Sequence, residues 1–379
     1  QLIMIDSKDV FEILISEGFQ FFTGVPDSLL KYFCAYITDN STSRSHIIAA
    51  NEGNAIALAA GHYLGTKSPS LVYLQNSGLG NIINPLISLA DKEIYSIPML
   101  IMIGLRGEPG VKDEPQHIKQ GRITKNILNS LEIKFFEIGP QNINNKSNIR
   151  AAIKSMKTNQ EPTALLVKKD TFKKYSLNLK DDLKTNLTRE NAIKNIIDNI
   201  SKESLVISTT GMISRELFEY RAQKNEGHFR DFLTVGSMGH ASSIALGLAL
   251  SRTDKKIVCL DGDGSLLMHL GSLAIQGSSD MDNLLHIVLN NGAHDSVGGQ
   301  PTVAQKINIT QIAKNCGYKN VFTALNSDQI ITKIKELNSY EQGPNLIEVI
   351  VSKGSRKDLG RPTRTPIINK DDFMKYIND

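Results

Sequence analysis

The chain has 379 residues, enough for two domains of ordinary size, and 40% of them are hydrophobic and 22% charged. This composition is typical of a globular protein and excludes a fibrous or disordered one. The formal net charge of +4 is small for this length, so neither nucleic acid nor an anionic membrane is expected as a partner. No apolar run reaches membrane-spanning length and residues 1–22 lack a signal-peptide layout, so we expect a cytoplasmic protein. Cys34, Cys259 and Cys316 match no metal-binding or redox spacing, and reduced buried thiols are expected.

Strands and helices are predicted to alternate in the first half of the chain. The amphipathic stretch around residues 10–14 indicates a helix, and the apolar residues before 23–27 indicate a strand that ends in a Gly/Pro turn. The further elements expected in chain order are a strand at 47–50, an alanine-rich helix at 54–64, and strands at 70–74, 99–103 and 164–168. This alternation predicts a parallel sheet covered by helices on both faces.

A second α/β half is predicted after a polar segment. Residues 170–188 are rich in Lys, Asp and Asn and weakly periodic, so we interpret them as a linker region. The elements expected after it are a strand at 204–208, a helix at 239–251, a strand at 256–260, a helix at 271–278, and strands at 286–290 and 345–351. The predicted division is a first domain of residues 1–170, a linker of residues 171–188 and a second domain of residues 189–379.

Two predicted strands of the second half end in polar turns. One turn reads Asp261-Gly262-Asp263-Gly264-Ser265, and the next strand ends in Asn290-Asn291-Gly292. Ligands bind beyond the carboxyl ends of parallel strands, and Mg²⁺ prefers oxygen ligands such as carboxylates. Gly262 and Gly264 would let the backbone approach a diphosphate closely. Each short motif alone is equally an ordinary turn, and their pairing on consecutive strand ends is what indicates a magnesium site.

This pairing resembles the signature of thiamine diphosphate-dependent enzymes, with a spacing one residue longer than in many members. The resemblance implies a pyrimidine-binding domain followed directly by a diphosphate-binding domain, with no middle domain. It also implies that Asp263, Asn291 and the backbone carbonyl of Ala293 hold Mg²⁺. The further residues that it places at the cofactor are Gly262, Gly264, Ser265, and Thr210 and Gly211 of the loop 209–212.

Two more residues fit the same resemblance. Glu52 lies between an apolar strand and the alanine-rich helix, where the family has a glutamate that hydrogen-bonds the aminopyrimidine ring and helps to remove the thiazolium proton. The alternative is a glutamate that the helix dipole favours at a helix N-terminus. Met238, among the small residues of 236–240, would wedge between the two cofactor rings, and a core methionine is its alternative.

Longer strings resemble the phosphonopyruvate decarboxylase family almost from end to end. These strings are 23–27, 75–78, 106–110, 113–117, 290–294 and 354–362. The resemblance implies decarboxylation of 3-phosphonopyruvate to phosphonoacetaldehyde and carbon dioxide through the thiamine diphosphate ylid, on a route to 2-aminoethylphosphonate. Sulfopyruvate decarboxylases share part of the set, so they remain an alternative, as does a catalytically silent cofactor-binding homologue.

The resemblance also suggests residues for the substrate. Asp27 and His117 would position it and move protons, although each has a solvated or capping role as its alternative. A phosphonate requires positive charge or N–H donors, so Arg356 and Arg361 of the basic loop 353–361 are expected to bind it, with Arg106 as the competing candidate and a solvated loop as the alternative. The remaining candidates for substrate binding are Asn76, Ser77 and His294. Relatives build their sites across a dimer interface, so a homo-oligomer with active sites at the subunit interface is expected.

Overall fold

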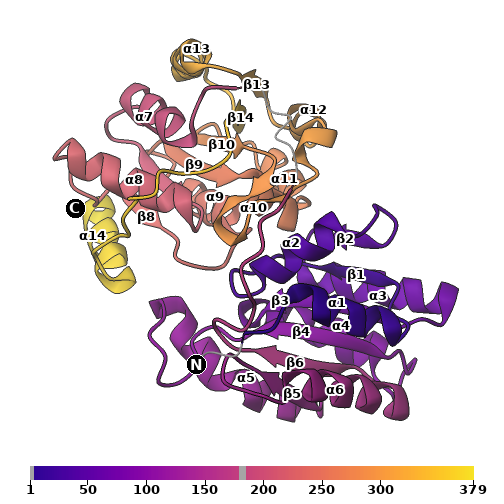
Figure 1. The fold of residues 1–379 in the computed structure, drawn as a ribbon. Helices are drawn as coiled ribbons and strands as arrows, with labels where there is room; N and C mark the ends of the chain where they lie inside the picture. Colours follow the sequence, from indigo (N-terminus) through magenta and orange to yellow (C-terminus); the bar gives the residue numbers. More distant parts are fainter. Residues whose placement is uncertain (1–3, 179–184) are drawn as a thin grey trace. The chain divides into compact units, whose positions relative to one another are not determined.

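The computed structural model describes residues 4–178 and 185–379, which form two compact units (Figure 1). The boundary lies near residue 180, and residues 297–300 belong to the first unit. Each unit contains a six-stranded parallel sheet, which confirms the predicted α/β class with two parallel sheets. The described residues hold no further domain between the two units. The division at 1–170, 171–188 and 189–379 stays a prediction, and residues 179–184 of the predicted linker lie outside the described part of the chain.

The first unit is built around strands β1 to β6, in the spatial order β2-β1-β3-β4-β6-β5. The strands are β1 Phe21–Gly24, β2 His46–Ile48, β3 Ser70–Gln75, β4 Met99–Gly104, β5 Phe135–Ile138 and β6 Thr163–Val167. The α-helices are α1 Ser7–Ser16, α2 Lys31–Asp39, α3 Glu52–Thr66, α4 Leu79–Pro85, α5 Pro115–Ser130 and α6 Asn145–Asn159.

The second unit has strands in the spatial order β13-β14-β10-β9-β7-β8, and β11 and β12 form a separate two-stranded ladder. The strands are β7 Leu205–Ser208, β8 Asp231–Leu233, β9 Ile257–Gly262, β10 Leu284–Asn290, β11 Ala293–His294, β12 Gln300–Pro301, β13 Asn320–Ala324 and β14 Asn345–Ile350. The α-helices are α7 Arg189–Asn199, α8 Met212–Gln223, α9 Ala241–Ser251, α10 Asp263–Met268, α11 Ser272–Gly277, α12 Ile309–Asn315, α13 Ser327–Asn338 and α14 Pro366–Asn378.

Alternate residues of the central strands point into cores on the two faces of each sheet. Leu71 and Tyr73 of β3 pack with α1, α2 and α6, whereas Val72 and Leu74 pack with α3 and α4. In the second unit β9 alternates in the same way, with α7, α8 and α13 on one face and α9 and α14 on the other. Because both faces are covered, the central residues of these strands, 71–74 and 257–260, form continuous hydrophobic runs from which the strands were predictable.

The elements that the sequence analysis did not predict include the edge strands β5 and β13 and the three-residue edge strand β8. Residues of β5 and β13 are mostly only half-buried, so they lack the long apolar run of a central strand. The strand expected at 256–260 extends further, to Gly262, and α10 begins directly afterwards at Asp263.

Two expectations from composition can be compared with the structure. No helix among residues 4–178 and 185–379 is long and apolar enough to cross a membrane. All three cysteines are free thiols, and Cys34 and Cys259 are buried as expected. Cys316 is only partly buried, because it lies at the exposed end of α12, where its backbone N–H caps the last turn.

Candidate active site

Asp263 and Asn291 lie at the same edge of the second sheet. Strands β9 and β10 are parallel neighbours, and their register pairs Gly262 with Leu289, close to the point where each strand ends. Asp263 is the first residue of α10, and Asn291 directly follows β10. Their exposed fractions are 2% and 4%. The arrangement therefore brings one carboxylate and one amide oxygen, both shielded from water, to adjacent strand ends, as the motif predicted.

Burial of the Asp263 carboxylate makes its ionised form costly. Burial raises its pKa to about 6, although hydrogen bonds from the Thr302 hydroxyl and the backbone N–H of Asn291 act in the opposite direction. The hydrogen bonds thus offset only part of the cost of holding a charge away from water. A buried carboxylate with this residual cost suits a site where a cation supplies the missing compensation.

The Asn291 side chain is held by its neighbours. Its Nδ2 donates to Asp295 Oδ2 at 2.7 Å, and its Oδ1 accepts from the N–H of Ala293 at 3.0 Å. Asp295 in turn accepts from Arg189 Nη1 at 3.1 Å. Asn290 differs, because its Oδ1 already accepts two hydrogen bonds, from the N–H of Gly292 at 3.0 Å and from Gln305 Nε2 at 2.9 Å. Of the two asparagines, Asn291 is therefore the one whose amide oxygen can serve a ligand beyond the strand end.

Predicted cofactor residues and one predicted substrate residue, His294, gather around α10. A Cβ atom on Gly264 would lie 2.9 Å from His294 Nδ1 and 3.4 Å from Met238 Cε, so both side chains lie close over this glycine. Burial lowers the pKa of His294 to about 4, which makes its ring neutral at neutral pH. The buried hydroxyl of Ser265 accepts from Thr209 Oγ1 at 3.0 Å and from the N–H of Gly239 at 3.1 Å. These two bonds attach the loop after β7 and the loop at 236–240 to the first turn of α10.

The loop with Thr210 and Gly211 follows β7. Thr210 and Gly211 are both half-buried, and Gly211 is the residue that precedes α8. A Cβ atom on Gly211 would lie 3.7 Å from Ser296, directly after Asp295. The structure therefore places this loop beside the segment that follows the Asn291 turn.

Glu52 is the first residue of α3 in the first unit and is 6% exposed. Asn51 is the helix cap, since its side chain accepts from the N–H of Asn54 at 3.0 Å, and Glu52 lies in the first turn, where the helix dipole also favours an acidic residue. The Asn81 amide donates to Glu52 Oε2 at 2.8 Å. A Cβ atom on Gly78 would lie 2.3 Å from Glu52 Oε1, so only glycine at that position allows the observed carboxylate position.

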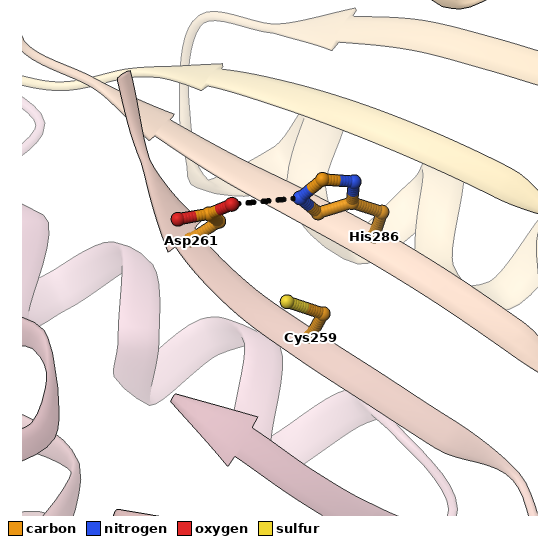
Figure 2. A group of neighbouring side chains, drawn as sticks. All are labelled: Cys259, Asp261 and His286. Atoms are coloured by element: carbon orange, nitrogen blue, oxygen red, sulfur yellow. Dashed lines mark hydrogen bonds and ion pairs between the residues drawn. The ribbon is translucent and has the colours of Figure 1, made fainter. Parts of the chain in front are cut away.

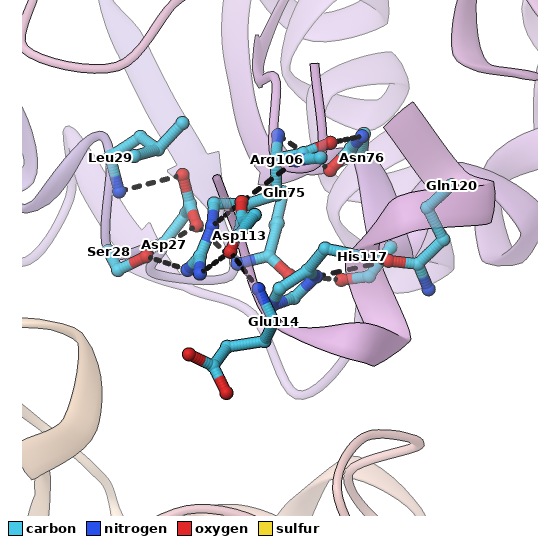
Figure 3. A network of polar contacts seen from close by, with 12 residues as sticks. Asp27, Ser28, Leu29, Gln75, Asn76, Arg106, Asp113, Glu114, His117 and Gln120 are labelled. Atoms are coloured by element: carbon cyan, nitrogen blue, oxygen red, sulfur yellow. Dashed lines mark hydrogen bonds and ion pairs between the residues drawn. The ribbon is translucent and has the colours of Figure 1, made fainter. Parts of the chain in front are cut away.

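Asp27 lies in a second polar network of the first unit, shown in Figure 3. The side chain is fully buried and accepts from Gln75 Nε2 at 2.5 Å and from the N–H of Leu29 at 3.1 Å. Ser77 Oγ donates to Gln75 Oε1 at 2.7 Å, which orients the Gln75 amide toward Asp27. Burial raises the pKa of Asp27, with the Gln75 hydrogen bond opposing the shift. Asp27 is therefore biased toward its protonated form.

Arg106 follows β4 in the same network (Figure 3) and is paired with Asp113. Its Nε donates to Asp113 Oδ2 at 2.8 Å, its Nη2 contacts the other carboxylate oxygen, and its Nη1 donates to Ser28 Oγ at 2.7 Å. Asn76 is buried and joins this loop by donating to the Arg106 carbonyl at 2.8 Å. Arg106 was predicted as a candidate for binding the phosphonate, and its positive charge is largely compensated by Asp113 within the first unit.

His117 lies in the first turn of α5 and is buried. Its Nδ1 is 3.3 Å from Gln120 Oε1, which can only accept, so Nδ1 carries a proton. Burial and the nearby Arg106 charge lower the pKa of His117. The neutral ring then has its lone pair on Nε2, and His117 is suited to accept a proton.

The basic loop after β14 contacts acidic residues. Arg356 pairs with Glu190 at 3.1 Å, with Asp358 at 3.2 Å and with Glu219. An anion would have to compete with these carboxylates for the guanidinium. Arg361, the other predicted residue of the loop, is exposed.

Among the residues that the structure describes, one buried group satisfies the proximity expected of metal ligands. Cys259 and Asp261 on β9 and His286 on β10 have ligand atoms within 4.8 Å of one another (Figure 2). Both ring nitrogens of His286 are already hydrogen-bonded, Nε2 to Asp261 at 3.1 Å and Nδ1 to the Tyr318 hydroxyl at 3.2 Å. Burial raises the pKa of the Cys259 thiol well above its usual value, which disfavours the thiolate that binds metals. We therefore assign this group to the packing of the sheet.

Sequence reasoning did not identify the residues that hold the predicted ones in place. These partners are Asn81 for Glu52, Gln75 for Asp27, Asp113 for Arg106, Asp295 for Asn291 and Thr302 for Asp263. Gln75 and Asp113 are in the strings that carried the family resemblance, which was an available signal. Thr302 follows Asp263 by 39 positions and lies in no recognisable motif.

Comparison with known families matches both units. Residues 7–128 match the family described as "Thiamine pyrophosphate enzyme, N-terminal TPP binding domain". Residues 209–349 match "Thiamine pyrophosphate enzyme, C-terminal TPP binding domain". The first range contains Glu52, and the second contains Asp263 and Asn291.

Three relatives are similar over almost the whole chain. A phosphonopyruvate decarboxylase of Streptomyces viridochromogenes is 34% identical over 96% of this chain and 92% of its own length. A phosphonopyruvate decarboxylase of Streptomyces hygroscopicus is 32% identical over the same shares. A sulfopyruvate decarboxylase of Methanosarcina acetivorans is 27% identical over 92% of each chain.

Proposed function

The chain belongs to the thiamine pyrophosphate enzyme family, and from this premise we propose that it decarboxylates 3-phosphonopyruvate to phosphonoacetaldehyde and carbon dioxide. The observation that supports phosphonopyruvate as the substrate is the 34% identity to a phosphonopyruvate decarboxylase over 96% of the chain. The sulfopyruvate decarboxylase of similar coverage is less similar, at 27% identity. Sulfopyruvate also carries a three-oxygen anionic group, so it is the alternative substrate.

The second unit would hold the diphosphate end of the cofactor through Mg²⁺. Asp263, Asn291 and the carbonyl of Ala293 are the proposed metal ligands, and the buried Asp263 carboxylate with its raised pKa supports a cation there. Gly262, Gly264, Ser265, Thr210 and Gly211 are the proposed diphosphate-side residues. Met238, whose side chain lies over Gly264, is the proposed wedge between the cofactor rings.

Thiamine diphosphate, when bound, supplies an electron sink that stabilises the negative charge left by the departing carbon dioxide. Glu52 is proposed to hold a proton at its carboxyl group and share it with the aminopyrimidine ring. Its burial and its contacts with Asn81 and Gly78 support this role, because they fix the carboxylate in one position.

Asp27 and His117 are proposed to handle the substrate protons. The raised pKa of Asp27 favours the acid that can donate a proton, and the lowered pKa of His117 favours the neutral ring that can accept one. Groups with pKa values shifted in this way are typical of acid–base pairs in active sites. Asn76, Ser77 and His294 are proposed to contact the substrate.

The phosphonate is proposed to bind cationic residues from the set Arg106, Arg356 and Arg361. In the structure Arg106 is paired with Asp113, and Arg356 with three carboxylates. Binding at either residue therefore requires the anion to share the guanidinium with an existing partner. We further propose a homo-oligomer with active sites at the subunit interface, in keeping with the resemblance to relatives that assemble in this way.

An assay of carbon dioxide release tests the proposal. Purified protein with thiamine diphosphate and Mg²⁺ is offered phosphonopyruvate, sulfopyruvate or pyruvate at equal concentration. The proposal expects the highest kcat/KM for phosphonopyruvate. A preference for sulfopyruvate selects the alternative, and cofactor binding without turnover of any of the three identifies a catalytically silent homologue.

A further inference from the structure

Thr302 lies beside the proposed metal ligands and is only 8% exposed. Its hydroxyl donates to Asp263 Oδ2. Its backbone N–H donates to the carbonyl of Gly292 at 2.9 Å, between the proposed ligands Asn291 and Ala293. One residue therefore contacts both turns that carry the proposed ligands.

The direction of the hydroxyl bond follows from its other contact. The N–H of Ala304 donates to Thr302 Oγ1 at 3.3 Å, so the oxygen already accepts one hydrogen bond. An ionised carboxylate can only accept, so the single hydroxyl proton points to Asp263. Such a bond to a charged acceptor is stronger than one between neutral groups, and it fixes the rotation of the Asp263 carboxylate.

We infer that Thr302 is a positioning residue for the divalent cation, which holds the Asp263 carboxylate and the Asn291–Ala293 turn in the arrangement that the cation requires. In this inference Thr302 acts through the Asp263 carboxylate and the Gly292 carbonyl and is not one of the proposed ligands. Partners of this kind orient metal ligands before the metal binds, and their loss weakens metal affinity. The inference rests on the proposed metal site but not on which 2-oxoacid is the substrate.

The test compares Thr302→Val, which keeps the shape and removes the hydroxyl, with Thr302→Ser, which keeps the hydroxyl. The affinity for Mg²⁺ at saturating thiamine diphosphate is measured by isothermal titration calorimetry, and Mn²⁺ binding is measured separately by electron paramagnetic resonance. We expect Thr302→Val to weaken cation binding by about 10- to 100-fold and Thr302→Ser to stay within about threefold of wild type. Thr323→Val, at an exposed position on β13, is the matched control and should bind as wild type does.

Several outcomes overturn the inference. One is a Thr302→Val protein that binds Mg²⁺ as tightly as wild type, and another is a Thr302→Ser protein that loses affinity as strongly as Thr302→Val. Thr302→Ala replaces Thr302→Val if the latter fails to fold, as judged by circular dichroism and thermal melting. If wild-type protein binds neither Mg²⁺ nor thiamine diphosphate, the proposed function itself fails, which is a different result from an unaffected variant.

Discussion

At the scale of single residues, the proposed catalytic and metal-binding side chains are each held by a specific neighbour. Asn81 holds Glu52, Thr302 holds Asp263, and Asp295 holds Asn291. A buried polar group without such a partner costs about 1–3 kcal/mol, so these contacts also stabilise the local structure. The arrangement gives each side chain one orientation before any ligand arrives.

Replacing Glu52 by Gln should affect cofactor binding and turnover differently. Glutamine keeps the size and can still accept from Asn81, but it cannot share a carboxyl proton with the aminopyrimidine ring. We expect cofactor affinity close to wild type and turnover lower by about 10²- to 10⁴-fold. Calorimetric titration and the decarboxylation rate measure the two effects, with Glu12→Gln, at an exposed position on α1, as a control. Turnover close to wild type would show that Glu52 has another role.

The phosphonate site can be tested with Arg356→Ala and Arg106→Ala. The variant that removes the phosphonate contact should raise KM for phosphonopyruvate by about 10-fold or more, as expected for a charged hydrogen bond of about 1.5–3 kcal/mol. Its residual activity on pyruvate, which has no phosphonate, should be nearly unchanged. Steady-state kinetics on both substrates gives the answer. Equal losses on both substrates would mean that the arginine supports the fold through its carboxylate partners.

At the scale of elements, a buried hydrogen-bonded chain joins β9, β10 and α11. Asp261 contacts His286, His286 contacts the Tyr318 hydroxyl, and Tyr318 donates to Gln276 Oε1 at 2.6 Å. All four side chains are almost completely buried. The chain therefore holds the two strands that end at the proposed metal site against the helix beside them.

Tyr318→Phe interrupts this chain. The Gln276 oxygen and the His286 ring each lose a buried partner, so we expect the free energy of unfolding to fall by about 1–3 kcal/mol. Urea denaturation measures the loss, and Tyr340→Phe, at a partly exposed position, is the matched control with an effect close to zero. A Tyr318→Phe protein as stable as wild type would contradict a structural role for the chain.

The edge strand β2 makes stability depend on pH through His46. Burial lowers the pKa of His46 to about 4, and its Nε2 lies 2.8 Å from the Tyr73 hydroxyl. Between about pH 4 and 6.5 the unfolded chain binds a proton that the folded chain does not, so stability rises with pH in this window. His46→Gln should reduce that rise by an amount on the order of 2–3 kcal/mol. The free energy of unfolding of both proteins is measured by urea denaturation at each pH. If it changes equally with pH in wild type and His46→Gln from pH 4 to 7, the prediction is refuted.

An element or site residue could be predicted from the sequence when its signal lies in a short continuous stretch of the chain. Central strands such as β4 and β9 are buried on both faces, so their continuous apolar residues were sufficient to predict them. The edge strands are short and half-buried, and they lack that pattern. The site motifs were local too, as Asp263 and Asn291 each follow a strand directly. Thr302 could not be predicted, because its contact with Asp263 depends on how the loop after β10 folds back onto α10.

At the scale of the whole molecule, the two units share one topology. When only the strands of each six-stranded sheet are numbered in chain order, the spatial order is 2-1-3-4-6-5 in both sheets. In parallel sheets, ligands bind at the point where the strand order reverses, beyond the carboxyl ends of the strands. Asp27 follows the first strand of the first unit, and Asp263 follows the third strand of the second unit, both next to that point. The same architecture thus carries a proposed substrate residue at this point in one unit and a proposed metal ligand at this point in the other.

The most direct test of the central claim is the rate of carbon dioxide release from phosphonopyruvate, measured with thiamine diphosphate and with or without Mg²⁺, for wild type and Asp263→Ala. The account predicts that wild-type protein releases carbon dioxide only when both cofactors are present. It also predicts that Asp263→Ala remains folded but fails to bind thiamine diphosphate in a Mg²⁺-dependent way, because the cation loses its carboxylate ligand. Activity that survives thorough chelation, or an Asp263→Ala protein that turns over phosphonopyruvate as wild type does, would contradict it.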